Sequence, residues 1–563
     1  MILRRVLATA AVLLLTVACA VVEDRPAVSM EMAGPALESI SGDRLLAHIE
    51  VLASDEFEGR LPGTVGEEKT VAYLLEQFES LGVEPGNPNG TYTQDVTLVG
   101  VRSNTTGSIA VDGQTLPLTF PENFVGVSYR EGDRVEVTGS EVVFVGYGVE
   151  APEYDWDDYE GQDMTGKTLV MLVSDPPVAD PNDPDALDPD MFNGEAMTLY
   201  GRWTYKYEIG ASKGADAVII VHETGPAGYP WDVVTGSWGG ENMSIQSDGG
   251  DAPLKVEAWI TDDFARELFA TAGHDFDALK DRARTADFEP VPLGATAEFT
   301  ADLQHRTVQS QNVVAKLPGA HPERRDEYVL YIAHWDHLGR DGDLIYNGAV
   351  DNATGTAMLI EMARAYTLLP EPPDRSILFL ALTAEEQGLL GARHYAENPL
   401  YPLERTVAVI NMDAFFPWGR TEDVIVIGRG SSTLEDVLER HASAQGRVLE
   451  PDAEPEKGFF YRSDHFEFAR QGVPALYIGT GTRFLDRPEG WGEAMREEFT
   501  RDHYHKPTDE VQTDWDMSGL VEDSQLLFLV GYDVAQTPAY PNWHEGNEFR
   551  ARRDAMLADR QGR

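Results

Sequence analysis

The 563-residue chain has few cysteines and few basic residues. Its single cysteine, Cys19, excludes any disulfide within the chain, so the fold must depend on its hydrophobic core. It has 44 lysine and arginine residues against 96 aspartate and glutamate residues, a formal net charge of −52. This charge disfavours nucleic acid and anionic membrane surfaces as main partners, because it repels phosphates. Hydrophobic residues (42%) and charged residues (25%) occur in the proportions of a folded globular chain.

Long apolar runs are also missing beyond the first residues. Two arginines precede the apolar stretch Val6–Val17, which is shorter than the ~20 residues of a membrane span. Residues 1–20 therefore predict a secretory signal. Cys19 resembles the lipid-attachment cysteine of bacterial lipoproteins, although Thr16 stands where leucine is usual, and simple cleavage after Ala20 is the alternative. Either route predicts export, to the periplasm or outer membrane or into the medium.

Changes in pattern along the chain predict six segments. Apolar residues at helical spacing run from Ser41 to Leu81, and alternating residues typical of antiparallel strands follow over 92–140. Short apolar strands around an acidic Pro/Asp loop then indicate a separate β-rich insertion. The predicted segments are a signal (1–20), a polar tether (21–38), the start of an α/β domain (39–138), the insertion (139–290), the main α/β domain (291–545) and a C-terminal tail (546–563).

The main domain alternates short apolar strands with helical stretches. Strands such as EYVLYIA, SILFLAL and TVAVINM are each followed by a helix or a loop. This order predicts an α/β/α sandwich with a central, mostly parallel, mixed sheet.

Histidines and carboxylates gather where these predicted strands end. In open α/β sheets, functional sites form at the carboxyl ends of the strands. Such residues follow three strands, open one helix and recur far downstream. They are His334, Asp336, His337, Asp351, Glu385, Glu386, Asp413, His503 and His505.

This residue set indicates a metal site. Zinc binds imidazole nitrogen and carboxylate oxygen with about four ligands per ion. Two histidines and three carboxylates can hold two ions if one carboxylate bridges them, and two ions roughly 3.5–4 Å apart can share one hydroxide. Cobalt and manganese are possible substitutes, since the donor set is nitrogen and oxygen without a thiolate.

The motifs AHWDHLG, NGAVDNATGTA, LTAEEQGLLGARHYA, VINMD, YRSDHFEFARQGVPAL and YHKPTDE occur in this order. Together they resemble the secreted co-catalytic two-zinc aminopeptidases of the Streptomyces and Aeromonas type, relatives of glutamate carboxypeptidase II. The resemblance covers about residues 40–130 and 300–540 and implies a zinc-exopeptidase fold. The insertion (YGV, GKTLVMLVSDPP, KYEIGASKGADAVIIV) resembles the protease-associated domain of secreted peptidases.

The resemblance implies a role for each matched residue. It makes Glu385 the general base, Asp336 a residue that orients His334 or supports the bridging position, and Tyr461 a candidate donor to the scissile carbonyl. Ser463, Asp464 and His465 resemble a motif that lines the family's site. The implied zinc ligands are His334 and Asp413 for one ion, Glu386 and His505 for the other, and Asp351 between them.

Some choices stay open in the sequence. His337 and His503 lie beside the preferred ligands and have structural hydrogen-bonding roles as their alternative. The aromatic residues near the ligands fit an apolar substrate pocket and the core equally well. These aromatic residues are Trp335, Phe415, Phe416 and Trp418.

The leading functional hypothesis is a two-zinc aminopeptidase acting on peptides. A carboxypeptidase or dipeptidase on the same scaffold is the alternative, and it would need clustered arginines for the terminal carboxylate. Arg420, Arg462 and Arg483 are scattered candidates for that role. Glutaminyl cyclisation and a catalytically inactive binding protein are less favoured, because the ligand set is complete. Side-chain specificity and oligomeric state are not encoded in any motif.

Overall fold

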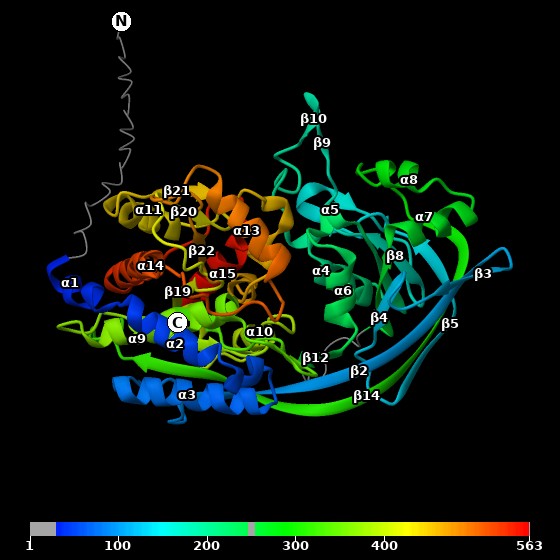
Figure 1. The fold of residues 1–563 in the computed structure, drawn as a ribbon. Coiled ribbons are helices and arrows are strands. Elements are labelled where there is room, and N and C mark those ends of the chain that lie inside the picture. Colours follow the sequence, from blue (N-terminus) through cyan, green and yellow to red (C-terminus); the bar gives the residue numbers. More distant parts are fainter. Residues whose placement is uncertain (1–29, 246–253, 562–563) are drawn as a thin grey trace, which may run out of the picture.

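The computed structural model describes residues 30–245 and 254–561, so the predicted signal and Cys19 lie outside the described residues. Two halves lie side by side, a helix-rich half and a strand-rich lobe (Figure 1). Two long strands, β2 (Thr93–Val111) and β14 (Val291–Leu317), extend from one half into the other. The expected boundary at 138/139 falls inside β5 (Arg134–Phe144), a continuous strand that pairs with β14.

The helix-rich half is built on a mixed sheet in the order β21-β20-β22-β19-β15-β18-β14. Four neighbouring central strands are parallel: β22 (Ala475–Thr480), β19 (Thr406–Asn411), β15 (Tyr328–His334) and β18 (Ser376–Leu382). Antiparallel β14 flanks β18, antiparallel β20 (Asp423–Val426) flanks β22, and β21 (Val448–Pro451) pairs parallel with β20. The predicted mostly parallel, mixed sheet is therefore confirmed.

Helices cover both faces of this sheet. Successive side chains of β15 point to opposite faces: Val329 and Tyr331 join one core cluster, and Leu330 and Ile332 join another. The first cluster is covered by α1 (Met30–Ser39), α2 (Gly42–Leu52), α3 (Val65–Leu81), α9 (Thr354–Thr367), α11 (Leu434–Ala444) and α14 (Ser518–Gln536). The second lies under α10 (Leu390–Glu397), α12 (His465–Arg470) and α15 (Arg550–Gln561).

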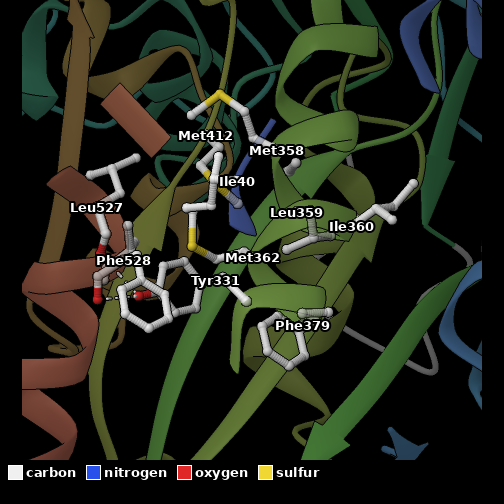
Figure 2. Packing of buried hydrophobic residues seen from close by; sticks show 14 of the residues in the cluster. Ile40, Tyr331, Met358, Leu359, Ile360, Met362, Phe379, Met412, Leu527 and Phe528 are labelled. Carbon is white, nitrogen blue, oxygen red and sulfur yellow. Dashed lines mark hydrogen bonds between the residues drawn. The ribbon is translucent and has the colours of Figure 1, made fainter. Parts of the chain in front are cut away.

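Figure 2 shows the first cluster between β15, α9 and α14. The Tyr331 hydroxyl donates to the carbonyl oxygen of Leu527 (2.9 Å) and lies 3.0 Å from the Tyr366 hydroxyl. Gly531 of α14 lies so close that a Cβ there would overlap the Tyr331 hydroxyl. A buried polar group is thus satisfied inside an apolar layer, and the packing requires glycine at one position.

The lobe continues the same sheet. Its parallel strands are β5, β8 (Thr168–Leu172), β11 (Ala217–His222) and β13 (Val256–Thr261), with antiparallel β4 (Phe124–Val127) at the edge. Its helices are α4 (Trp203–Ser212), α5 (Thr224–Ala227), α6 (Trp231–Trp238), α7 (Asp262–Thr271) and α8 (Phe276–Arg282). The protease-associated identity of this lobe stays a prediction. The remaining elements are β1 (Glu84–Pro85), β3 (Gln114–Leu118), β6 (Glu150–Ala151), β7 (Trp156–Asp157), β9 (Ala179–Asp180), β10 (Asp183–Leu187), β12 (Glu241–Ile245), β16 (Gly339–Asp341), β17 (Leu344–Tyr346) and α13 (Trp491–Asp502).

Two expected irregular segments contain packed helices. The later part of the predicted tether (21–38) belongs to α1, whose Ala33 and Ala36 are buried against the main core. The predicted tail contains α15, and its Arg553 is fully buried and donates to the carbonyl oxygen of Thr406 (3.1 Å). Both segments carry too few large apolar residues to reveal their packing in the sequence. Among the residues described, no helix combines the length and apolar character needed to cross a bilayer.

Candidate metal centre

Three parallel strands deliver the predicted ligands to one edge of the sheet. His334 is the last residue of β15 and lies in register with Leu382 at the end of β18. Glu385 and Glu386 follow β18 after a short turn, and Asp413 follows β19. The carboxyl ends of parallel strands meet at one edge, so residues about 80 positions apart come into contact there.

The five predicted ligands form one continuous chain of contacts. His334 Nε2 lies 3.2 Å from Asp413 Oδ1 and 3.4 Å from Asp351 Oδ1. The other oxygen of Asp351 lies 3.3 Å from His505 Nε2, and this nitrogen lies 3.1 Å from Glu386 Oε2. Asp351 therefore stands between the two histidines and turns one oxygen toward each.

The donor set fits metal ions. Two groups have ligand atoms within 4.8 Å of one another, and both contain His334: one with Glu385 and Asp413, the other with Asp351 and Glu386. Within the described residues, no lysine or arginine forms an ion pair with any of these four carboxylates. Buried carboxylates need a compensating cation, and nitrogen and oxygen donors suit zinc.

The electrostatics also favour cations at this position. Burial disfavours the charged form of both histidines, yet the surrounding carboxylates raise the pKa of His334 and of His505 well above the ordinary value. Burial opposes ionisation of Glu386 as well, but attraction to His505 and His337 lowers its pKa to about 2. The pocket therefore stabilises positive charge between its carboxylates.

Glu385 differs from the other carboxylates. Burial, with repulsion from Glu386 and Asp413, raises its pKa well above the ordinary value despite attraction to His334. Its carboxylate lies 3.9 Å from His334 Nε2, and its side chain is 11% exposed. A carboxylate with a raised proton affinity, beside the metal-binding groups and reachable from solvent, has the properties of a general base.

Neighbouring groups hold the ligands in place. The Ser463 hydroxyl donates to Asp413 Oδ2 (2.5 Å) and accepts from the Asn411 amide (2.6 Å). His337 Nδ1 lies 2.5 Å from Glu386 Oε1, so His337 contacts a predicted zinc ligand. Asp509 accepts from the main-chain N–H of Asp351 (3.1 Å). Each contact restricts the rotamer or backbone of a ligand.

Asp336 contacts both His334 and Glu385. Its carboxylate accepts from the main-chain N–H of Glu385 (3.0 Å), while its main-chain oxygen lies 3.2 Å from His334 Nδ1. Its carboxylate also lies 3.8 Å from His334 Nδ1, so Asp336 contacts the His334 ring and holds the main chain of Glu385 as well. The sequence cannot separate these two contacts, because they depend on how the chain turns after β15.

Tyr461 is not aimed at the metal-binding groups. Its hydroxyl donates to Glu548 (2.7 Å), so its predicted role as carbonyl donor is wrong. The tyrosines that face the cluster are Tyr504, whose ring stacks on His505 at 3.9 Å and is 42% exposed, and Tyr477. Burial and the charges of Asp413 and Glu385 raise the pKa of Tyr477 well above its ordinary value. The position of Tyr504 next to a predicted ligand was the available sequence signal.

The structure also places the remaining histidine, aromatic and arginine candidates. His503 Nδ1 lies 2.8 Å from the main-chain oxygen of Thr508, and His503 is half-buried. Trp335 and Phe415 are fully buried core residues, whereas the Phe416 and Trp418 rings stack at 4.3 Å and are only partly buried. Asp464 and His465 are also fully buried. Arg420 pairs with Glu522 and Arg483 with Glu450, away from the metal-binding groups.

Comparisons with known proteins find a matching family model and similar sequences. Residues 312–529 match the model of Peptidase family M28. The mouse (Mus musculus) "Aminopeptidase NAALADL1" is 38% identical over 134 residues, 22% of this chain and 17% of its own length. Aminopeptidase YwaD of Bacillus subtilis (strain 168) is 30% identical over 226 residues, 38% of this chain and 43% of its own length.

A solved aminopeptidase from Aneurinibacillus sp. strain AM-1 shares the fold, with a TM-score of 0.51 and 20% identity over 90% of this chain and 97% of that one. The aligned part spans less than half the length of the two curated relatives. The resemblance seen in the sequence motifs is confirmed for the region that carries the ligands.

Proposed function

We propose that this protein is a zinc-dependent aminopeptidase that hydrolyses the N-terminal peptide bond of peptides. The carrying observation is the chain of contacts Asp413–His334–Asp351–His505–Glu386, with Asp351 shared between the two histidines. In this proposal His334 and Asp413 hold one zinc ion, His505 and Glu386 hold the other, and Asp351 bridges both. Two bound zinc ions would supply an activated water and polarise the scissile carbonyl.

Side chains of the protein would transfer the proton, position the base and donate to the carbonyl oxygen. Glu385 accepts a proton from the attacking water and passes it to the leaving amine, a transfer that its raised pKa favours. The Asp336 carboxylate fixes Glu385 by accepting a hydrogen bond from the main-chain N–H of Glu385. Tyr504, half-exposed beside His505, is the proposed hydroxyl donor to the carbonyl oxygen.

The test is a panel of aminoacyl-nitroanilides, assayed with and without a zinc chelator and alongside zinc analysis of the purified protein. The proposal expects two zinc ions per chain and hydrolysis that stops on chelation and returns with zinc. A purified chain that binds zinc but cleaves no free-amine substrate would refute the aminopeptidase assignment. A chain that binds no zinc would favour the inactive binding protein.

One observation favours the carboxypeptidase or dipeptidase alternative. Arg462 lies at the lobe, where its guanidinium donates to the carbonyl oxygen of Ala227 (3.1 Å). Burial and repulsion from Arg462 lower the pKa of Arg202 to about 10, and Glu385 and Tyr504 are close enough to act on it in the opposite direction. Each arginine lies over an aromatic ring, Arg202 over Trp203 at 5.3 Å and Arg462 over Phe459 at 5.4 Å. An arginine close enough to act on Glu385 suits a substrate carboxylate.

Comparing N-blocked peptides with amino-acid amides separates the two activities. An aminopeptidase cleaves the amides and leaves N-blocked peptides intact. A carboxypeptidase shows the reverse, and replacing Arg202 or Arg462 by methionine would then raise KM more than it lowers kcat.

Export is also proposed, on the N-terminal sequence alone. The two arginines, the short apolar run and Cys19 support a lipoprotein signal. Mass spectrometry of the mature N-terminus, compared between the native chain and a Cys19→Ala variant, tests lipidation against simple cleavage.

A further inference from the structure

The N-terminal segment before α3 reaches the loops that carry the ligands. The 3₁₀ turn at Asp55–Arg60 ends with three left-handed residues, Glu58, Gly59 and Arg60, at φ 48°, 67° and 54°. A Cβ at Gly59 would overlap the carbonyl oxygen of Gly339, at the base of the β16–β17 hairpin. Glycine therefore allows the close approach that places the next side chain, Arg60, beneath the metal centre.

Arg60 is 1% exposed and donates to carbonyl oxygens on both ligand-bearing loops. Its Nε donates to Trp335 (2.9 Å), the residue after His334. Its Nη1 and Nη2 donate to Asn347 (2.6 Å) and Gly348 (3.0 Å), just before Asp351. A further bond from Nη1 to Leu52 (2.6 Å) anchors the guanidinium at the end of α2.

Asp509 holds the same loop from the other side. Its carboxylate accepts from the main-chain N–H groups of Val350 (3.0 Å) and Asp351 (3.1 Å). The carbonyl groups of residues 347–348 are thus bound by a cation and the N–H groups of residues 350–351 by an anion. The backbone leading to Asp351 has little freedom to move.

We propose that Arg60 is a positioning residue that sets the separation of His334 and Asp351 for zinc binding. The proposal rests on the proposed two-zinc function. Position 60 needs arginine in particular, because a planar guanidinium presents donors in several fixed directions. A lysine ammonium is a compact charge that cannot reach four carbonyls spread around it.

A matched control separates positioning from general stability. Arg375 is also fully buried, and it donates to the carbonyl oxygens of Val534 (2.6 Å) and Pro538 (3.0 Å). It precedes β18, so a seven-residue strand of roughly 23 Å separates it from the metal-binding edge. Arg375→Lys removes comparable buried bonds without touching a ligand loop.

The experiment measures zinc affinity of the full chain by competition with a chromogenic chelator, with zinc alone as the probe. Arg60→Lys, Arg60→Met and Asp509→Asn are expected to weaken at least one zinc site by about 10- to 100-fold. Arg375→Lys is expected to lower the melting temperature while both zinc affinities stay within twofold of wild type. Asp509→Asn keeps the test informative if either Arg60 variant fails to fold.

Three outcomes would count against the inference. Unchanged zinc affinity in the folded Arg60 variants overturns it and leaves the proposed function intact. An equal loss in Arg375→Lys also overturns it, because the effect would then be general destabilisation. A wild-type chain that binds no zinc overturns the proposed function itself.

Discussion

Replacing Glu385 by glutamine separates proton transfer from metal binding. The amide has nearly the same size, and the main-chain N–H that Asp336 accepts from is unchanged. The side chain loses only its capacity to take a proton. General-base contributions of about 10²–10⁴-fold correspond to about 3–5 kcal/mol of transition-state stabilisation. We expect kcat on a leucine nitroanilide to fall by that factor while the chain retains two zinc ions.

Glu386→Gln is the matched control, because its carboxylate lies 3.1 Å from His505 and 2.5 Å from His337. This variant is expected to lose zinc, measured by metal analysis after dialysis. Near-normal turnover of Glu385→Gln with both ions bound would refute the base assignment. Loss of one ion in Glu385→Gln would instead identify Glu385 as a ligand, which its grouping with His334 and Asp413 permits.

Three further predictions concern other parts of the molecule. Tyr504→Phe is expected to lower kcat by about 10²–10³, whereas Tyr461→Phe leaves kcat unchanged and costs about 1 kcal/mol of stability; equal kcat losses would contradict this assignment. Burial lowers the pKa of His465 to about 3, below its value in the unfolded chain, so only the unfolded state gains a proton as pH falls below about 6.5. The free energy of unfolding should then decrease by up to about 1.4 kcal/mol per pH unit. Urea titrations should find a smaller decrease in His465→Gln. Gly531→Ala is expected to destabilise the fold by about 1–3 kcal/mol, because the new methyl overlaps the Tyr331 hydroxyl; an unchanged melting temperature would contradict the packing.

The candidate ligand residues could be selected from the sequence because the signal is local. A buried strand such as Tyr328–His334 is a nearly continuous apolar run. The polar residues His334 and Asp336 mark the point where this run ends. Parallel strands place their carboxyl ends at one edge, so the gathering of His334, Glu386 and Asp413 follows from topology. The lobe was visible for the same reason, as a run of short apolar strands. Its edges were less clear, because β2 and β14 belong to both halves.

Selection among neighbouring residues depended on the tertiary structure. The contacts of His337, Asp336 and Tyr461 depend on the path of the chain around each residue, which no local pattern specifies. Arg60 lies 275 positions from Trp335, and no periodicity marks it. By itself, the sequence determined which metal-binding residue types gather at the sheet edge, because the strands and the residues that follow them are visible as local patterns. Only the folded chain decided which side chains position these residues. Their partners are distant main-chain carbonyl and N–H groups, which carry no sequence signal.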